Sequence, residues 1–256
     1  MTKLSVIVVT KNEAENIDAC LKSVSFADEI IVFDSSSTDG TPDICRNYTH
    51  QVTITSDWPG DGQQKNRALA CAQGDWVLCL DADERVSPEL AAEIRTTMMQ
   101  SSHAAFALRF QSTYCGKPIR FGDWRNESHV RLFRRTKAKF TDDIVHCHLQ
   151  VEGSIGKLNH FVTHHPFHHL NAMLAKMNHY SSQSAKTLFN HGKKASLLTA
   201  LSHRLWCFIR GYFLKGGFLD GREGFLLALS NAEGTYYRYL KLMYLSEQSN
   251  TDPTHD

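Results

Sequence analysis

Pairs of carboxylates directly after apolar runs are the residues of this sequence most suited to chemistry. Asp81 and Asp83 flank one alanine behind an apolar run, and such oxygen ligands can hold a divalent cation that would neutralise a diphosphate. Asp34 closes an earlier apolar run, where its carboxylate can accept hydrogen bonds from a base or a ribose. Asp81 and Asp83 could instead belong to a polar loop, and Asp34 to an ordinary turn. The position of each residue in the fold must decide between these structural and functional interpretations.

Three basic side chains could bind phosphate groups of a ligand. Lys65 follows Gly60-Asp61-Gly62 at an expected helix start, where it either reaches a phosphate or base carbonyl or stays solvated. Arg131 and Arg134 could grip phosphates of an acceptor, because guanidinium groups match phosphate geometry.

Two later stretches combine acids and histidines. Asp142 and Asp143, followed by His146, could supply a general base and a further ligand, or form a charged turn before a strand with surface histidines. Residues 164–169 contain four histidines, of which one could bind a metal or a phosphate while the others are loop residues.

Strands and helices alternate through the first hundred residues, and this alternation would position the polar groups. The expected strands are 4–9, 29–33, 51–54 and 76–80, and the expected helices 14–24, 41–48, 63–72 and one that starts at Ser87-Pro88-Glu89. Short loops between them predict an α/β domain with a mainly parallel sheet. Such sheets bind ligands at the carboxyl ends of their strands, where the polar groups after strands one, two and four would gather.

The chain has 256 residues, 42% of them hydrophobic and 21% charged, which excludes a disordered or collagen-like protein. The first hundred residues carry 8 Lys/Arg and 16 Asp/Glu, whereas residues 101–256 carry 20 and 11, so the halves differ in charge. Seven cysteines without a C-x-x-C pair predict free thiols. We expect neither a signal peptide nor a spanning helix.

The chain is expected to be helical from residue 171 onward. Leu197, Leu201 and Leu205 begin a wide apolar stripe that continues with two aromatics and is flanked by basic residues. This pattern indicates a helix that packs on the core, or one that lies on anionic lipid, and we expect a surface that does both. No stacking or zinc module accompanies the basic residues, so nucleic acid is not an expected partner.

Four blocks in order and spacing resemble the family 2 glycosyltransferases: LSVIVVTKNEAENI at 4–17, VFDSSSTDGT at 32–41, GQQKNRAL at 62–69 and GDWVLCLDADE at 74–84. Later blocks, RLFRR at 131–135, FTDDIVH at 140–146 and GFLDGREGF at 217–225, resemble the lipopolysaccharide-core β-1,4-glucosyltransferases. The resemblance implies a GT-A fold over residues 1–165 with a C-terminal helical region over 166–256. It also implies inverting transfer of a hexose, glucose from UDP-glucose, to inner-core heptose of lipopolysaccharide or another lipid-linked saccharide.

The resemblance also implies roles for single residues. Thr10, Glu13 and Asp34 would line the nucleoside pocket with Lys65 nearby. Asp81 would face ribose or metal, and Asp83 would coordinate Mg²⁺ or Mn²⁺. The protein would work in the cytoplasm, peripherally on the inner face of the cytoplasmic membrane.

One position departs from the family pattern. Relatives often have V-H-E where this chain has Val145-His146-Cys147, so a base at that glutamate is missing here. Asp143 or Asp142 then becomes the candidate base, with His146 in support.

Other functions stay open beside this one. They are transfer of another UDP-hexose to a different envelope glycan, and non-catalytic binding of a sugar nucleotide at the membrane surface. A pyrophosphorylase or a dinucleotide oxidoreductase would want glycines after the first strand, but the first glycine is Gly40.

Overall fold

The structure, a computed structural model, describes residues 2–142 and 147–251, the last three by backbone alone, and divides them into two compact units. The first unit comprises the chain up to Gln111 together with Asn126–His164. The second comprises Ser112–Arg125 and the chain from His165 on, so residues 112–125, from the middle of the first predicted domain, belong with the C-terminal helices.

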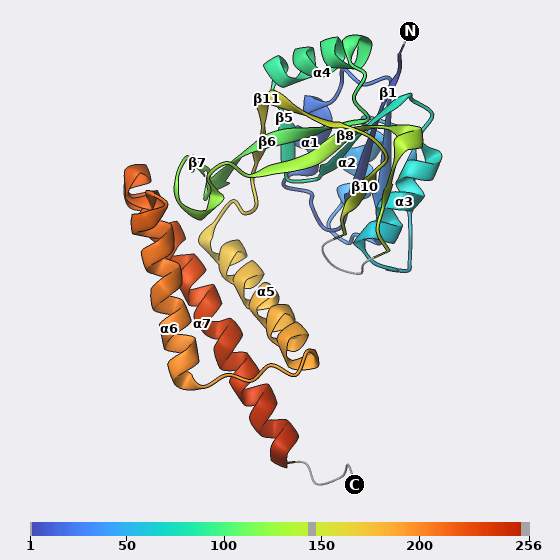
Figure 1. Cartoon of the computed structure of the whole chain (residues 1–256). Helices are drawn as coiled ribbons and strands as arrows, with labels where there is room; N and C mark the ends of the chain where they lie inside the picture. Colours follow the sequence, from blue (N-terminus) through green and yellow to red (C-terminus); the bar gives the residue numbers. More distant parts are fainter. Residues whose placement is uncertain (1, 143–146, 252–256) are drawn as a thin grey trace. The chain divides into compact units, whose positions relative to one another are not determined.

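The elements of the first unit follow the alternation that the sequence predicts (Figure 1). They are β1 (Leu4–Thr10), α1 (Ile17–Ser23), β2 (Glu29–Asp34), α2 (Thr41–Arg46), β3 (Val52–Ile54), α3 (Asp61–Cys71), β4 (Trp76–Asp81), β5 (Glu84–Val86), α4 (Pro88–Gln100), β6 (Ala105–Tyr114), β8 (Ser128–Arg134), η2 (Arg135–Lys137), β9 (Ala138–Phe140), β10 (Leu149–Val151) and β11 (Ile155–His164). The end of β6, from Ser112 on, belongs to the second unit.

The main sheet has the strand order β3-β2-β1-β4-β8-β6-β11-β5. The first four strands pair in parallel, which confirms the predicted α/β core. Antiparallel strands extend it, because β8 pairs with both β4 and β6, and β11 pairs with β5.

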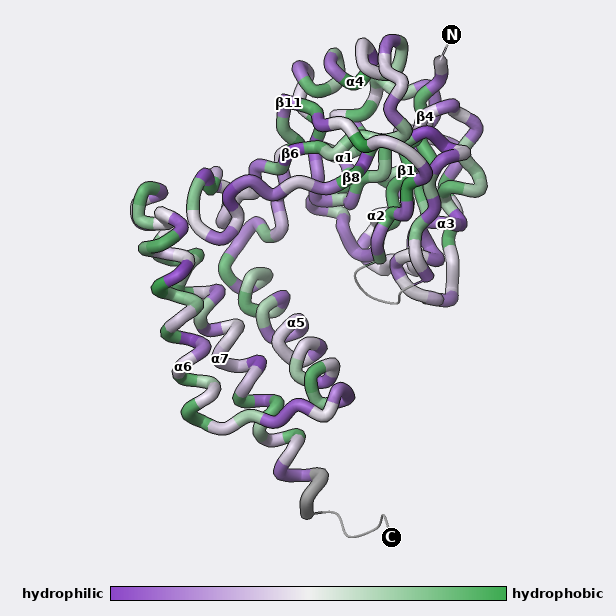
Figure 2. Tube along the Cα trace, in the orientation of Figure 1, coloured by the Kyte–Doolittle hydropathy of each residue, from purple (hydrophilic) through white to green (hydrophobic). Residues whose placement is uncertain are grey.

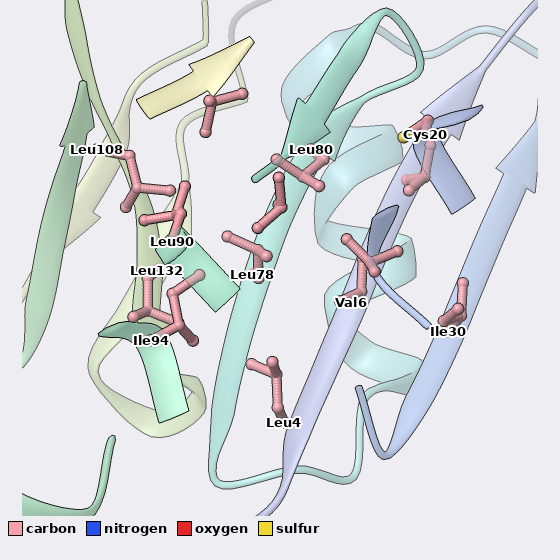
Figure 3. Packing of buried hydrophobic residues seen from close by; sticks show 14 of the residues in the cluster. Leu4, Val6, Cys20, Ile30, Leu78, Leu80, Leu90, Ile94, Leu108 and Leu132 are labelled. Carbon is pink, nitrogen blue, oxygen red and sulfur yellow. The ribbon is translucent and has the colours of Figure 1, made fainter. Parts of the chain in front are cut away.

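Alternate side chains of the parallel strands build two apolar layers, as the period of two along a strand requires. Val6, Val8 and Leu78 face α1 and α4 in one layer, while Ile7 and Val77 face α3 in the other. Figure 3 shows the first layer, in which leucines from several strands meet side chains of α1 and α4. This double cover leaves the polar strand ends as the part of the sheet that can meet a ligand.

The second unit consists mainly of helices. Its elements are β7 (Lys117–Pro118), η1 (Gly122–Trp124), α5 (Leu170–Asn190), α6 (Leu197–Ile209), the π-helical turn η3 (Arg210–Leu214), η4 (Gly217–Asp220) and α7 (Gly221–Thr251). Helices α5 and α6 both pack along α7 (Figure 1). All seven cysteines are free, as predicted. Among the described residues, no helix is long and apolar enough to cross a bilayer.

Candidate active site

The strand ends bring three predicted residues into one row. Thr10 lies opposite Asp34 in the pairing of β1 with β2, and Asp81 lies opposite Val9 in the pairing of β1 with β4. Asp34 is fully buried and accepts hydrogen bonds from the backbone N–H and the hydroxyl of Ser37, at 2.8 and 2.6 Å. The buried Thr10 hydroxyl has no hydrogen-bond partner among the described residues, so it is available to a polar ligand group.

Two loops beside this row are tied to each other. The Glu13 N–H donates to the Thr41 hydroxyl at 2.9 Å, and Asp39 accepts from the Ala14 N–H at 3.0 Å. The Glu13 carboxylate is half-buried and accepts from the Asn16 side chain at 2.8 Å. These bonds hold the loops after β1 and β2 together, so Glu13 is kept near the ends of both strands.

Asp81 lies between two cations. Its Oδ1 is 3.2 Å from Lys65 Nζ, and its Oδ2 accepts a hydrogen bond from Arg131 Nη2, which also donates to Glu84. Lys65 reaches this point from the first turns of α3, where Asp61 holds its ammonium at 3.0 Å. The cluster therefore pairs two buried cations with three carboxylates at the end of β4.

The ion pairs set the protonation of this cluster. Burial alone would raise the pKa of Asp81, but attraction to Arg131 and Lys65 outweighs burial and holds that pKa well below its usual range. Burial alone would lower the pKa of Lys65, yet the Asp81 charge keeps it above its ordinary value. For Glu84 burial dominates and raises the pKa. At neutral pH Asp81 therefore stays ionised between Lys65 and Arg131.

Asp83 points to a different partner. It is largely buried, and its Oδ2 lies 3.4 Å from His164 Nε2. The antiparallel pairing of β5 with β11 places His164 opposite Glu84 and so brings the histidine beside the D-A-D segment. One carboxylate oxygen and one imidazole nitrogen are a donor pair that Mn²⁺ accepts. The described residues contain no group of three or more metal-ligating side chains, so a cation held by this pair would need further ligands that these residues do not supply.

The predicted base region meets the site at its described ends. A Cβ on Gly62 would lie 1.8 Å from the Thr141 carbonyl oxygen, so only glycine lets this segment approach the start of α3. The Cys147 thiol donates to Asp61 at 3.0 Å, and burial together with this bond raises the pKa of the thiol to about 12. Asp142 is exposed. Asp143 and His146 lie outside the described residues.

The predicted arginine Arg134 does not join this group. It lies opposite Trp76, at the start of β4, whereas Asp81 ends that strand. Its guanidinium donates to the carbonyls of His103 and Ser101, at 3.1 and 2.8 Å, and stacks over the Trp76 ring.

The histidines of residues 164–169 make different contacts. His164 joins Asp83, as described above. His165 is within 3.2 Å of the Thr113 hydroxyl, and His169 caps α5 by accepting from the Ala172 N–H. His165, His168 and His169 lie in the loop between β11 and α5, which confirms the predicted loop for these three, whereas His164 ends β11.

Sequence reasoning assigned no role to Glu84 or Asp61. Both stand inside motifs that it singled out, Glu84 directly after Asp83 and Asp61 in the glycine loop before Lys65. The sequence could have indicated ion pairs at these two carboxylates, because buried cations such as Lys65 and Arg131 need anionic partners.

Comparison with known proteins decides the family. The model of the family described as Glycosyl transferase family 2 matches residues 5–157. The chain belongs to this family. It is 34% identical to an uncharacterised glycosyltransferase of Rickettsia prowazekii, over 100% of this chain and 92% of that protein.

This family 2 glycosyltransferase is also similar to a relative with a named role and to a solved structure. The lipopolysaccharide core biosynthesis glycosyltransferase LpsC of Rhizobium meliloti is 27% identical over 90% of this chain and 87% of its own. The crystal structure of Staphylococcus aureus TarS in complex with UDP matches with a TM-score of 0.50 at 17% identity, covering 96% of this chain and 92% of that one. The latter likeness concerns the fold, and the GT-A fold implied by the resemblance is confirmed.

Proposed function

We propose that this nucleotide-sugar transferase moves glucose, with inversion, from UDP-glucose to a heptose of the lipopolysaccharide inner core. The observation that carries the proposal is the row of strand ends, where Asp81 lies beside the buried cations Lys65 and Arg131 and Asp83 lies beside His164. The lipopolysaccharide core role named for LpsC supports the acceptor, since that relative is similar over most of this chain.

The nucleoside would bind along Thr10, Glu13 and Asp34. Thr10 offers a buried hydroxyl that lacks a partner among the described residues. Asp34 accepts two bonds from Ser37, and a carboxylate has further lone pairs for a base N–H or a ribose hydroxyl. A ligand that donates to Asp34 and bonds Thr10 would satisfy both residues at once.

The diphosphate would lie beside Lys65 and Arg131. Their positive charges are fixed before the reaction by Asp81, so they need no reorganisation when negative charge develops on the leaving group. Asp83, with His164 beside it, would hold Mn²⁺ or Mg²⁺, which when bound supplies further positive charge for the diphosphate. Asp81, whose two oxygens already face cations, would serve mainly to position those cations.

The reaction would be a single displacement. The oxygen of the acceptor hydroxyl forms a bond to the anomeric carbon. The bond between that carbon and the diphosphate oxygen breaks, and the electron pair of the broken bond leaves with UDP. The hydroxyl proton passes to a carboxylate base. Asp143 is the proposed base, Asp142 is its neighbour, and His146 would support it, whereas the Cys147 thiol, with its pKa near 12, is no base at neutral pH.

The base assignment is tested by comparing turnover of Asp143→Asn with that of Asp142→Asn. We expect a loss of roughly a hundredfold or more only in the first variant. A dead Asp142→Asn beside an active Asp143→Asn would move the role to the neighbour.

Donor and acceptor are tested by measuring UDP release from a panel of UDP-sugars with Mn²⁺, with and without heptose-terminated lipopolysaccharide core. We expect UDP release from UDP-glucose at a rate that rises when this acceptor is added. Release from another UDP-hexose would change the donor and keep the reaction class. Tight nucleotide binding without release from any donor would instead indicate a sugar-nucleotide-binding protein.

A further inference from the structure

Helix α6 turns its large apolar side chains outward. Leu198 and Leu205 are 76% and 60% exposed, and Leu201 and Trp206 are exposed beside them. The turn that follows adds exposed Phe213 and Leu214. We call these six residues the outer face of α6, and Figure 2 shows hydrophobic residues along this helix. The sequence predicts a surface that both packs on the core and lies on lipid, and Leu197, Leu201 and Leu205 are exposed, so these three leucines do not serve the packing.

The opposite side of α6 explains the outward leucines. Its buried residues are small, namely Ala200, Cys207 and, in the following turn, Gly211. A Cβ on Gly211 would come within 2.9 Å of the Asp123 carboxylate, so a larger residue here would have to displace this ion-paired side chain. Packing against α7 through small residues leaves no buried place for the leucines, although soluble helices usually bury their large apolar side.

The turn after α6 is held in shape from within the second unit. Asp220 accepts hydrogen bonds from the backbone N–H groups of Arg120 and Phe121, at 3.0 and 2.8 Å. Asp123 pairs with Arg210 and Lys215. Phe213 and Leu214 are thus presented by an ordered turn, which lowers the entropy cost of binding a partner.

Positive charge accompanies the outer face. Residues 193–222 contain six Lys or Arg and one acidic residue, Asp220. Four of these cations are in ion pairs with acids outside this segment, namely Arg204 with Glu233, Arg210 and Lys215 with Asp123, and Arg222 with Glu223. Lys193 and Lys194, exposed directly before α6, make no ion pair with the described residues.

We propose that the outer face of α6 binds the surface of an anionic lipid bilayer. Leucine, tryptophan and phenylalanine would enter the boundary between headgroups and acyl chains, while the flanking cations meet the lipid phosphates. A second copy of the chain is a poorer occupant, because a symmetric contact would bring two basic surfaces together. This surface anchors a peripheral protein on the membrane, as the sequence predicts, and it is independent of the proposed reaction.

The test is sedimentation of the full chain with vesicles that contain no glycan, of phosphatidylcholine alone or with about one third phosphatidylglycerol. We expect binding to the anionic vesicles that weakens in high salt. Leu198→Ser with Leu205→Ser should lower the partition coefficient roughly tenfold or more. The matched control, Met99→Ser with Ile155→Ser, removes two exposed apolar side chains of the first unit and should bind as the wild type does.

A second variant tests the charge separately. Lys193→Gln with Lys194→Gln should weaken binding to anionic vesicles by roughly fivefold per lysine and leave binding to neutral vesicles unchanged. Circular dichroism checks that each variant is folded. Equal vesicle binding by the wild type and the leucine variant overturns the proposal, and so does a stable dimer without vesicle binding. Because no donor or acceptor is present, failure here leaves the proposed glycosyl transfer untouched.

Discussion

Arg134 and Arg131 belong to one five-residue motif, but the structure predicts opposite results for their replacement. Arg134 lies opposite Trp76, five residues before Asp81 on β4, which corresponds to roughly 16 Å along a strand. Arg134→Met should therefore leave the kcat/KM for UDP release within about threefold of the wild type, because an effect at this distance is expected to be small.

The cost of Arg134→Met should appear in stability. The variant loses two hydrogen bonds to backbone carbonyls, each worth about 1 kcal/mol, and a stacking contact at 4.6 Å over Trp76 worth about the same. Methionine regains part of the packing, so we expect a net loss of about 2 kcal/mol. For a chain of this size that lowers Tm by about 4–8 °C.

Arg131→Met is the matched comparison. It leaves Asp81 and Glu84 without their shared guanidinium, and we expect kcat/KM to fall by roughly a hundredfold or more. Thermal melting and initial rates of UDP release measure both effects. A large fall in kcat/KM for Arg134→Met at unchanged Tm would refute the placement of the two arginines.

Further predictions concern Gly62, Glu84 and Asp81. Gly62→Ala should cut turnover at least tenfold with a small change in Tm, because its Cβ would displace the Thr141 carbonyl; unchanged turnover would show that this approach is not needed. Glu84→Gln should change the free energy of unfolding little at pH 7, since burial raises the pKa of Glu84. Asp81→Asn should lower the free energy of unfolding by about 2–3 kcal/mol, because it leaves the cations unpaired. Because the pKa of Asp81 is lowered in the folded state, its stabilisation is present at neutral pH and declines below about pH 4, so urea titrations of Asp81→Asn and wild type should converge in acid. A constant difference down to pH 2 would contradict that assignment.

The gathering of Thr10, Asp34 and Asp81 was predictable from the sequence, because parallel strands end at one edge of a sheet. Which of the two arginines, Arg131 or Arg134, meets Asp81 was not, since it depends on how β8 pairs with β4. A run of alternating residues fixes which face a side chain takes, but not which partner residue it lies opposite.

The same limit applies to contacts between distant segments. Asp83 meets His164 only because β5 pairs with β11, and no local pattern encodes that pairing. The stripe on α6 shows a second limit, because periodicity reports an apolar side and not what covers it. The small residues Ala200, Cys207 and Gly211 on the other side were the signal that the leucines face outward.

We propose that the strand-end site transfers a sugar from a nucleotide donor. The most direct test is the initial rate of UDP release from UDP-glucose, with Mn²⁺ and heptose-terminated core, for the wild type and Asp83→Asn. We expect release by the wild type that stops with a chelator, and a loss of roughly a thousandfold in the variant at an unchanged Tm. Release by Asp83→Asn near the wild-type rate would contradict it.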